Sequence, residues 1–238
     1  MKAAQRKKLI ITLIVLIPLT ALIFIIRGGT PAIYLYSKTA FSLGFVFYAL
    51  ITIYRCKTPD MLSLMSFSAL IIGMVGDIFI FIAKYTEITG SIPGSVLFLI
   101  QHILMCAGLL IHAKNSGRLK KLLIVLPATA AGVCLYVFVL YCIGGDAFSS
   151  LAVLMAIYGT ILAWAAAIPF TVRAKGDSRL LLLGIAGIVF FAADSLLICG
   201  QIDSAPPILS AINLIPYYYA QYLIAFSTGM TGSKGGQK

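Results

Sequence analysis

Apolar residues run along the chain in eight long stretches, which short polar or glycine- and proline-containing segments separate. Each stretch has close to the ~20 residues that an α-helix needs to cross the hydrocarbon core of a bilayer. They are too long and continuous for the strands of a membrane β-barrel. In the bilayer core a spanning segment must also satisfy its own backbone hydrogen bonds. The pattern therefore predicts eight transmembrane helices, over residues 9–26, 33–54, 61–83, 93–113, 119–142, 149–172, 180–200 and 207–227.

Composition agrees with an all-α membrane protein. Of the 238 residues, 61% are hydrophobic and only 11% are charged, whereas a soluble domain has about 25% charged residues. The predicted organisation is a basic cytoplasmic tail over 1–8, an eight-helix bundle over 9–227 and a flexible cytoplasmic tail over 228–238. The first stretch also resembles a signal peptide, but its apolar core is long and no small-residue cleavage site follows it, so we interpret it as a span.

Basic residues gather in every second connection. With eight spans, one side of the membrane holds 15 of the 18 Lys and Arg residues, and the other side holds only Arg27 and Lys84, since Lys38 lies inside a span. Cytoplasmic connections of membrane proteins carry an excess of Lys and Arg. The pattern predicts a multi-pass protein of the cell membrane with both termini in the cytoplasm. The net charge of +11 is then a sign of topology and does not indicate a nucleic-acid partner.

Two spans each contain a single acidic residue in an otherwise apolar sequence: Asp77 in "IIGMVGDIFIFIA" and Asp194 in "GIVFFAADSLLIC". An ionised side chain at this depth costs roughly 2.5–3.5 kcal/mol, so such residues usually have a partner or a function. Their distances from the span starts place both at a similar depth, and Lys38 lies near the same layer. We expect two carboxylates and one ammonium to meet in one hydrated pocket.

Further polar residues are expected to face this pocket. Asn213, Tyr217 and Gln221 recur every four residues and form one stripe on the last span, where Pro216 is expected to introduce a kink. The remaining members come from the same span and from two others: Tyr218, Tyr219, Gln101, His102 and Tyr158.

Each of these residues also has a purely structural interpretation. The tyrosines are compatible with packing or with an interfacial belt, and His102 with a hydrogen-bonded core residue. Lys38 has a stem long enough to bring its charge to the interface. The acids are compatible with a structural ion pair, although one lysine cannot neutralise both Asp77 and Asp194.

Two neighbouring carboxyl groups in an apolar interior provide both an acid and a base, because only one of them ionises readily. Such a pair suits the hydrolysis of a bond whose cleavage begins with proton delivery. The chain lacks G-x-S-x-G, H-E-x-x-H and P-loop motifs, which disfavours a serine lipase and a nucleotide-driven pump. Its two histidines and five cysteines form no zinc-binding pattern, so we expect no zinc site.

An ordered set of motifs resembles the YhhN family, the lysoplasmalogenases of bacteria and animals. The resemblance extends from about residue 38 to 226, with Met105 and Ala193 at positions where the family often has tyrosine and serine. The motifs are "GMVGD" (73–77), "GSVLFLIQH" (94–102), "YGTILAWAA" (158–166), "GIVFFAADSLL" (187–197) and "PYYYAQYLIA" (216–225).

The resemblance implies an integral membrane hydrolase that cleaves the vinyl ether bond of lysoplasmalogens to a fatty aldehyde and a glycerophospho-base. Its partners would be this lysophospholipid and the membrane lipids, with no metal or organic cofactor. Asp77 and Asp194 would share the acid and base roles. Lys38 or His102 would hold the phosphate or tune the acid pair. Water or glycerol hydroxyls would be placed by Tyr217, Tyr218 and Gln221.

Three other functions stay open at this point. Buried acids and an internal lysine also suit a proton-coupled transporter, which would move its substrate chemically intact. A lipid-binding protein without turnover has the same composition. A hydrolase of a different ether lipid or of an epoxide would use similar groups.

Overall fold

The computed structural model describes residues 31–56, 58–86, 92–144, 152–175, 177–199 and 212–230. This part of the chain is all-helical and contains no strand. It comprises seven α-helices and one short 3-10 helix, η1. The elements are α2 (Pro31–Tyr54), α3 (Met61–Thr86), α4 (Ile92–Asn115), η1 (Leu119–Lys121), α5 (Leu122–Gly144), α6 (Ala152–Val172), α7 (Ser178–Cys199) and α9 (Leu214–Thr228).

Six of these helices are long and apolar enough to cross a membrane, namely α2 to α7. They coincide within a few residues with the six spans predicted between 33 and 200, so the multi-pass prediction is confirmed. The predicted span over 9–26 lies outside the described residues. The last span, predicted over 207–227, is described only from residue 212, where α9 has 15 residues. The number of eight spans and the side of the termini therefore stay predictions.

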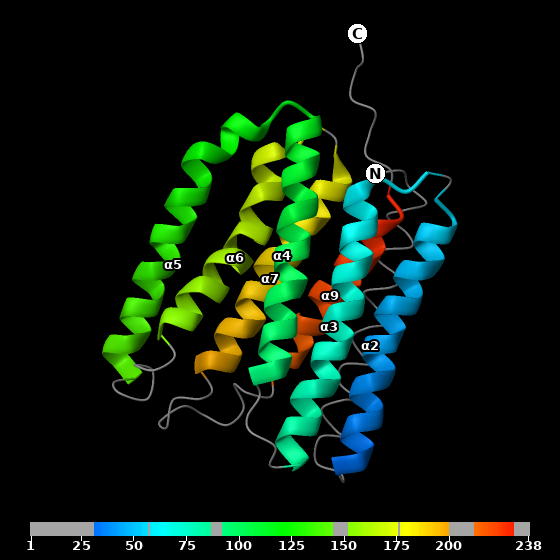
Figure 1. The fold of residues 1–238 in the computed structure, drawn as a ribbon, viewed down its shortest axis with the longest axis vertical. Coiled ribbons are helices and arrows are strands. Elements are labelled where there is room, and N and C mark those ends of the chain that lie inside the picture. Colours follow the sequence, from blue (N-terminus) through cyan, green and yellow to red (C-terminus); the bar gives the residue numbers. More distant parts are fainter. Residues whose placement is uncertain are drawn as a thin grey trace.

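The helices run up and down the molecule in alternation (Figure 1). The most extensive contact joins α3 and α4, and α9 packs against α2, α3 and α7. On the other side, α6 packs against α4, α5 and α7. Because α5 has its main contacts with α6 and η1, it lies at one edge of the bundle (Figure 1).

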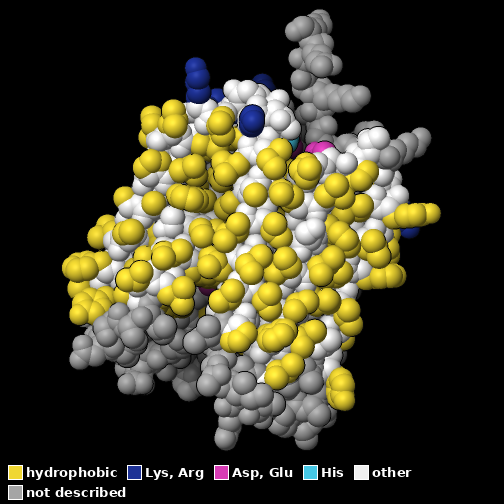
Figure 2. Space-filling model, in the orientation of Figure 1, with side chains coloured by type: hydrophobic (Ala, Val, Ile, Leu, Met, Phe, Trp, Pro, Cys, Tyr) yellow, Lys and Arg dark blue, Asp and Glu magenta, His cyan; other side chains and the backbone are white. Residues whose placement is uncertain are grey.

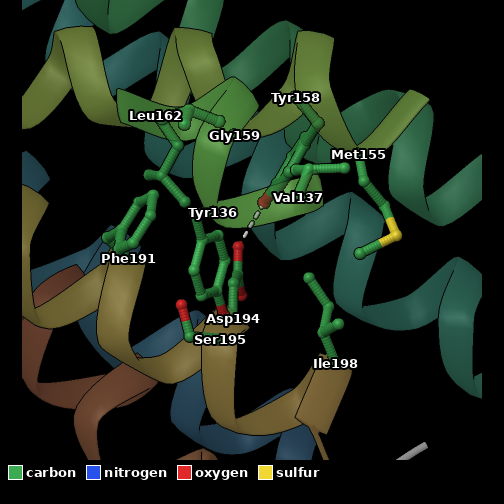
Figure 3. Close-up of a pocket in the computed structure, with 11 residues that line it drawn as sticks. Tyr136, Val137, Met155, Tyr158, Gly159, Leu162, Phe191, Asp194, Ser195 and Ile198 are labelled. Atoms are coloured by element: carbon green, nitrogen blue, oxygen red, sulfur yellow. Dashed lines mark hydrogen bonds between the residues drawn. The ribbon is translucent and has the colours of Figure 1, made fainter. Parts of the chain in front are cut away.

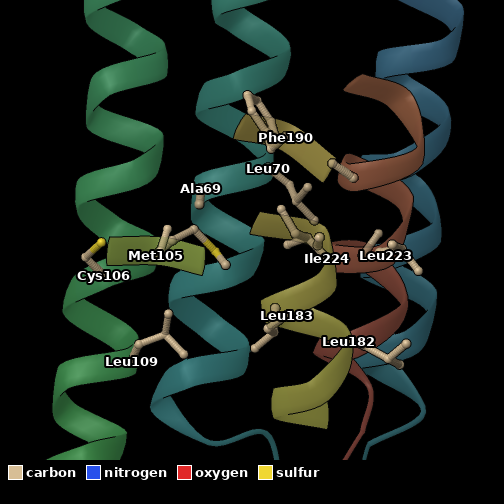
Figure 4. Packing of buried hydrophobic residues seen from close by; sticks show 14 of the residues in the cluster. Ala69, Leu70, Met105, Cys106, Leu109, Leu182, Leu183, Phe190, Leu223 and Ile224 are labelled. Atoms are coloured by element: carbon tan, nitrogen blue, oxygen red, sulfur yellow. The ribbon is translucent and has the colours of Figure 1, made fainter. Parts of the chain in front are cut away.

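The interior is filled by apolar side chains that several helices contribute. Figure 4 shows Leu70 of α3, Met105 of α4, Phe190 of α7 and Ile224 of α9 turned toward one another, and each of these side chains is buried. The outer flank is apolar as well, with large side chains exposed along it (Figure 2). An apolar exterior of this extent is the surface that lipid, and not water, solvates.

The connections α2–α3, α4–α5 and α6–α7 lie together at one end of the bundle (Figure 1). Lys and Arg side chains are visible at this same end in Figure 2. We call it the basic end. It carries the exposed Arg55, Lys120, Lys121 and Lys175. The predicted grouping of these basic connections on one side is therefore found in the described part of the chain.

An ion pair at the basic end joins α3 to α7, the two helices that carry the intramembrane acids. The guanidinium of Arg179, which is 2% exposed, donates to Asp60 Oδ2 at 2.6 Å and to Ser63 Oγ at 2.9 Å. Asp60 also caps the first turn of α3, where its Oδ1 accepts from the Ser63 N–H. Partial burial raises the pKa of Asp60, but Arg179 and Ser63 outweigh this effect and lower the pKa to about 2. The pair fixes where α3 and α7 start relative to each other.

Asp77 and Asp194 each lie 16 residues after the first residue of their helices. At the rise of an α-helix this is about 24 Å from the basic end. The predicted common depth of the two acids is therefore confirmed.

Candidate functional site

Asp77 is enclosed by donors from three directions. Its Oδ1 pairs with Lys38 Nζ of α2 at 2.9 Å. Its Oδ2 accepts hydrogen bonds from Ser42 Oγ of α2 and from the Tyr217 hydroxyl of α9, both at 2.7 Å. Asp77 is 2% and Lys38 8% exposed, so Lys38 does not reach the interface. The expected meeting of Lys38 with an acid is found, and the acid is Asp77.

Two amides extend this arrangement toward α4. Gln221 Nε2 donates to the Tyr217 hydroxyl at 3.1 Å, and Gln101 Nε2 donates to Gln221 Oε1 at 3.1 Å. Gly73 faces the pair, since a side chain there would collide with Gln101 Oε1. The stripe predicted from the four-residue spacing is thus present for Tyr217 and Gln221. We use the name Asp77 cluster for Lys38, Ser42, Asp77, Gln101, Tyr217 and Gln221.

The helical run is interrupted close to Pro216, where the sequence predicts a kink. Ile212 is helical, Asn213 is a turn residue, and α9 begins at Leu214, so Pro216 occupies the first turn of α9. A proline is tolerated there because N–H groups in the first turn have no partner within the helix. Asn213 is buried just before this turn, and its Oδ1 has no hydrogen-bond partner among the described residues. Tyr218 is fully buried, and its hydroxyl donates to the Lys38 carbonyl at 3.4 Å.

Asp194 has different surroundings. The Tyr158 hydroxyl of α6 donates to its Oδ2 at 2.5 Å (Figure 3). No described side chain donates to its Oδ1, and no described Lys or Arg forms an ion pair with it. Asp194 is only half-buried. This carboxyl group therefore has one hydrogen-bond donor where Asp77 has three.

A small cavity between α5, α6 and α7 lies beside Asp194. Tyr136 of α5 and Ser195 of α7 contribute two further hydroxyl groups next to the carboxylate (Figure 3). The other walls are apolar, with a glycine where α6 faces α5. They consist of Val133, Val137, Met155, Gly159, Leu162, Phe191 and Ile198. The cavity thus has a mainly apolar lining with a few polar groups, those of Tyr136, Tyr158, Asp194 and Ser195.

A row of four rings separates the two acids. The ring centroids of Tyr158 and His102 are 5.7 Å apart, those of His102 and Phe190 4.6 Å, and those of Phe190 and Tyr217 5.3 Å. The outer two tyrosines donate to Asp194 and Asp77 respectively.

The expectation that both carboxylates share one pocket is therefore corrected. They do not hydrogen-bond to each other, and the residues that line the cavity include Asp194 but not Asp77. Phe190 lies one helical turn before Asp194 on α7 and fills the space between α7, α4 and α9, while Lys38 bonds to Asp77.

His102 is buried within this row. Its Nδ1 lies 2.7 Å from the Phe98 carbonyl. Because a carbonyl oxygen only accepts, Nδ1 carries the proton of this bond, and Nε2 is the acceptor nitrogen when the ring is neutral. His102 is thus oriented by its own helix, with its ring against Tyr158 and Phe190.

Sequence reasoning missed Ser42, Tyr136 and Ser195. Hydroxyl residues are common in membrane helices, so their presence alone is a weak signal, although Ser195 directly follows Asp194. No group of three or more His, Cys, Asp or Glu side chains that could hold a metal ion occurs in the described ranges.

The model of the YhhN family matches residues 33–228, which include both acids, α9 and the six long helices except the first two residues of α2. No curated protein and no solved structure matches the chain.

Proposed function

We propose, on the premise that this chain belongs to the YhhN family, that it is a hydrolase of the cell membrane that cleaves the vinyl ether bond of lysoplasmalogens. The products would be a fatty aldehyde and a glycerophospho-base. The substrate is a single-chain lysophospholipid, which would reach the protein from the surrounding bilayer.

The observation that carries this proposal is the cavity beside Asp194. Its lining is apolar apart from a carboxyl group and three hydroxyl groups, those of Asp194, Tyr136, Tyr158 and Ser195. One of its walls is α5, which lies at the edge of the bundle (Figure 1). We propose that a single-chain amphiphile enters from this edge and brings the bond near its head group to Asp194.

The chemistry needs a proton donor and a group that takes a proton from water. Protonation of the β-carbon of a vinyl ether leaves an oxocarbenium ion, which a carboxylate stabilises and to which water adds. The resulting hemiacetal collapses to an aldehyde and an alcohol. The two intramembrane carboxyl groups, Asp77 and Asp194, are the candidates for these roles.

Purified protein in detergent or liposomes, supplied with lysoplasmenyl-ethanolamine, should release fatty aldehyde. The matched control is the saturated alkyl ether with the same head group, which has no double bond to protonate and should give no aldehyde. Recovery of the vinyl ether intact on the far side of the liposomes would instead indicate a transporter. Retention of the lipid without turnover would indicate a binding protein.

A further inference from the structure

We infer that the two intramembrane aspartates have different tasks. Asp194 is the catalytic residue, whose carboxyl group exchanges protons with the lipid, and Asp77 is a fixed anion that pairs with Lys38 and holds α2, α3 and α9 together. The inference rests on the proposed function and assigns its acid–base step to one of the two candidate residues.

Asp77 is held in place by its ion pair and its hydrogen bonds. Lys38, Ser42 and Tyr217 donate to its two oxygens, so both oxygens already have partners within the protein. Ser42 is fully buried and Asp77 nearly so. Protonation of Asp77 would remove the counter-charge of a buried ammonium, which is strongly destabilising. A group that must gain and lose a proton in every turnover cannot have a partner of this kind without that cost.

Asp194 has none of these constraints. Its one hydrogen bond from the described residues, donated by Tyr158, goes to Oδ2 and leaves Oδ1 for a ligand. No described cation pairs with it, so a change in its protonation leaves no buried charge without a partner. It also lines the cavity, whereas Asp77 does not. Of the two acids, Asp194 is therefore the one that can both contact the lipid and change its protonation.

One carboxyl group suffices for the whole reaction. Protonated Asp194 donates to the β-carbon of the vinyl ether, where a C–H bond forms from the π pair and the α-carbon becomes an oxocarbenium ion. The Asp194 carboxylate then takes a proton from water as the water oxygen bonds to that α-carbon. Asp194 is protonated again, and the neutral hemiacetal loses the glycerol oxygen as its hydroxyl proton moves to it. One water is consumed, and the donor returns to its starting state.

The two tyrosines at the ends of the aromatic row give a matched test. Tyr158→Phe removes the hydrogen bond to Asp194, and Tyr217→Phe removes one to Asp77. Aldehyde release from lysoplasmenyl-ethanolamine is measured as kcat against pH. We expect Tyr158→Phe to lower kcat about tenfold and to displace a limb of the pH profile, because it changes the proton affinity of the reacting group. Tyr217→Phe should keep the wild-type limbs and lower the melting temperature.

A second set of variants distinguishes the loss of a buried charge from the loss of the catalytic group. Asp194→Asn should lower kcat by about 10²- to 10⁴-fold in a folded protein. The double variant Lys38→Met/Asp77→Asn removes both charges of the pair together and should stay within about tenfold of wild-type kcat. Asp77→Asn alone should melt at a lower temperature than the double variant, because it leaves Lys38 buried without a counter-charge.

The outcomes are distinguishable. If the wild-type protein releases no aldehyde, the proposed function fails and the inference with it. If the wild type is active but Tyr217→Phe displaces the pH limbs, Asp77 takes part in the proton transfer and the assignment is wrong. A folded double variant as inactive as Asp194→Asn would lead to the same conclusion, as would unchanged limbs in Tyr158→Phe. These last three results would leave the proposed function standing.

Discussion

Arg179 and Asp60 show how a single polar contact at the rim of the bundle bears on the intramembrane residues. Arg179 is buried and Asp60 lies before the first turn of α3, with its side chain 46% exposed. Their bond sets the relative height of α3 and α7, and therefore of Asp77 and Asp194. An exposed partner limits the energy of such a pair because water screens its charge. The main contribution of this ion pair is therefore to align α3 with α7.

The depressed pKa of Asp60 gives a pH-dependent prediction. The pKa is 3.8 for the free side chain and about 2 in the fold, so the pair stabilises above about pH 4 and is lost as the pH falls toward 2. Asp60→Asn keeps the helix cap but not the charge. In detergent, its melting temperature should lie below that of the wild type at pH 7, and the gap should close near pH 2.

Lys175→Gln is the matched control for Asp60→Asn, because it removes an exposed charge at the same end of the bundle. It should melt with the wild type at every pH. A gap for Asp60→Asn that is equally wide at pH 7 and pH 2 would contradict the role given to the ion pair.

Among the helices, the contact of α6 with α7 decides whether the cavity exists. Gly187 of α7 lies so close to α6 that an added Cβ would be 2.5 Å from the Ala166 Cα. Small residues allow membrane helices to approach in this way. The approach brings Tyr158 of α6 within hydrogen-bonding distance of Asp194 of α7. Gly159 of α6 likewise allows a close approach of α5, since a Cβ there would lie 2.9 Å from Val133 Cγ1.

Gly187→Ala should therefore push α6 and α7 apart. The collision involves backbone atoms of Ala166, which cannot rotate away, so we expect a loss of about 1–3 kcal/mol in unfolding free energy, the usual cost of overpacking. The Tyr158–Asp194 bond should weaken and aldehyde release should fall. Gly132→Ala in α5 is the control, because its added Cβ meets nothing within 4 Å and should cost no stability. Equal stability of both variants would rule out the close contact.

On the scale of the molecule, the basic end and the acid layer define a direction across the membrane. The three described basic connections lie at one end (Figure 1). Asp77 and Asp194 lie in the half away from it, because each is 16 residues along its helix. If the basic end faces the cytoplasm, the cavity is nearer the outer leaflet, and its lipid enters from there.

Cysteine labelling tests this direction. In a cysteine-free background, Thr58→Cys and Ser116→Cys place a thiol on exposed positions of the basic end. A membrane-impermeant maleimide should label them only after the membrane is opened. Asp146→Cys, in the connection that the sequence predicts for the other side, should react in intact cells. Labelling of position 58 or 116 in intact cells would reverse the orientation.

The sequence by itself determined the helical class, six spans that the structure has within a few residues, the depth of both acids and the stripe of Tyr217 and Gln221. These features follow from local rules. The length of an apolar run identifies a span. The rise per residue of the α-helix gives the depth of a side chain, and the helical period gives the face on which it lies.

Only the tertiary structure decided that Lys38 bonds to Asp77, that Phe190 and His102 separate the acids, and that Asp194 lines a cavity with Tyr136 and Ser195. Apolar helices are alike in sequence, and no hydrophobic force selects their neighbours within a bilayer. Their pairing depends on the shapes of surfaces such as those at Gly187 and Gly159, which exist only once the helices are packed.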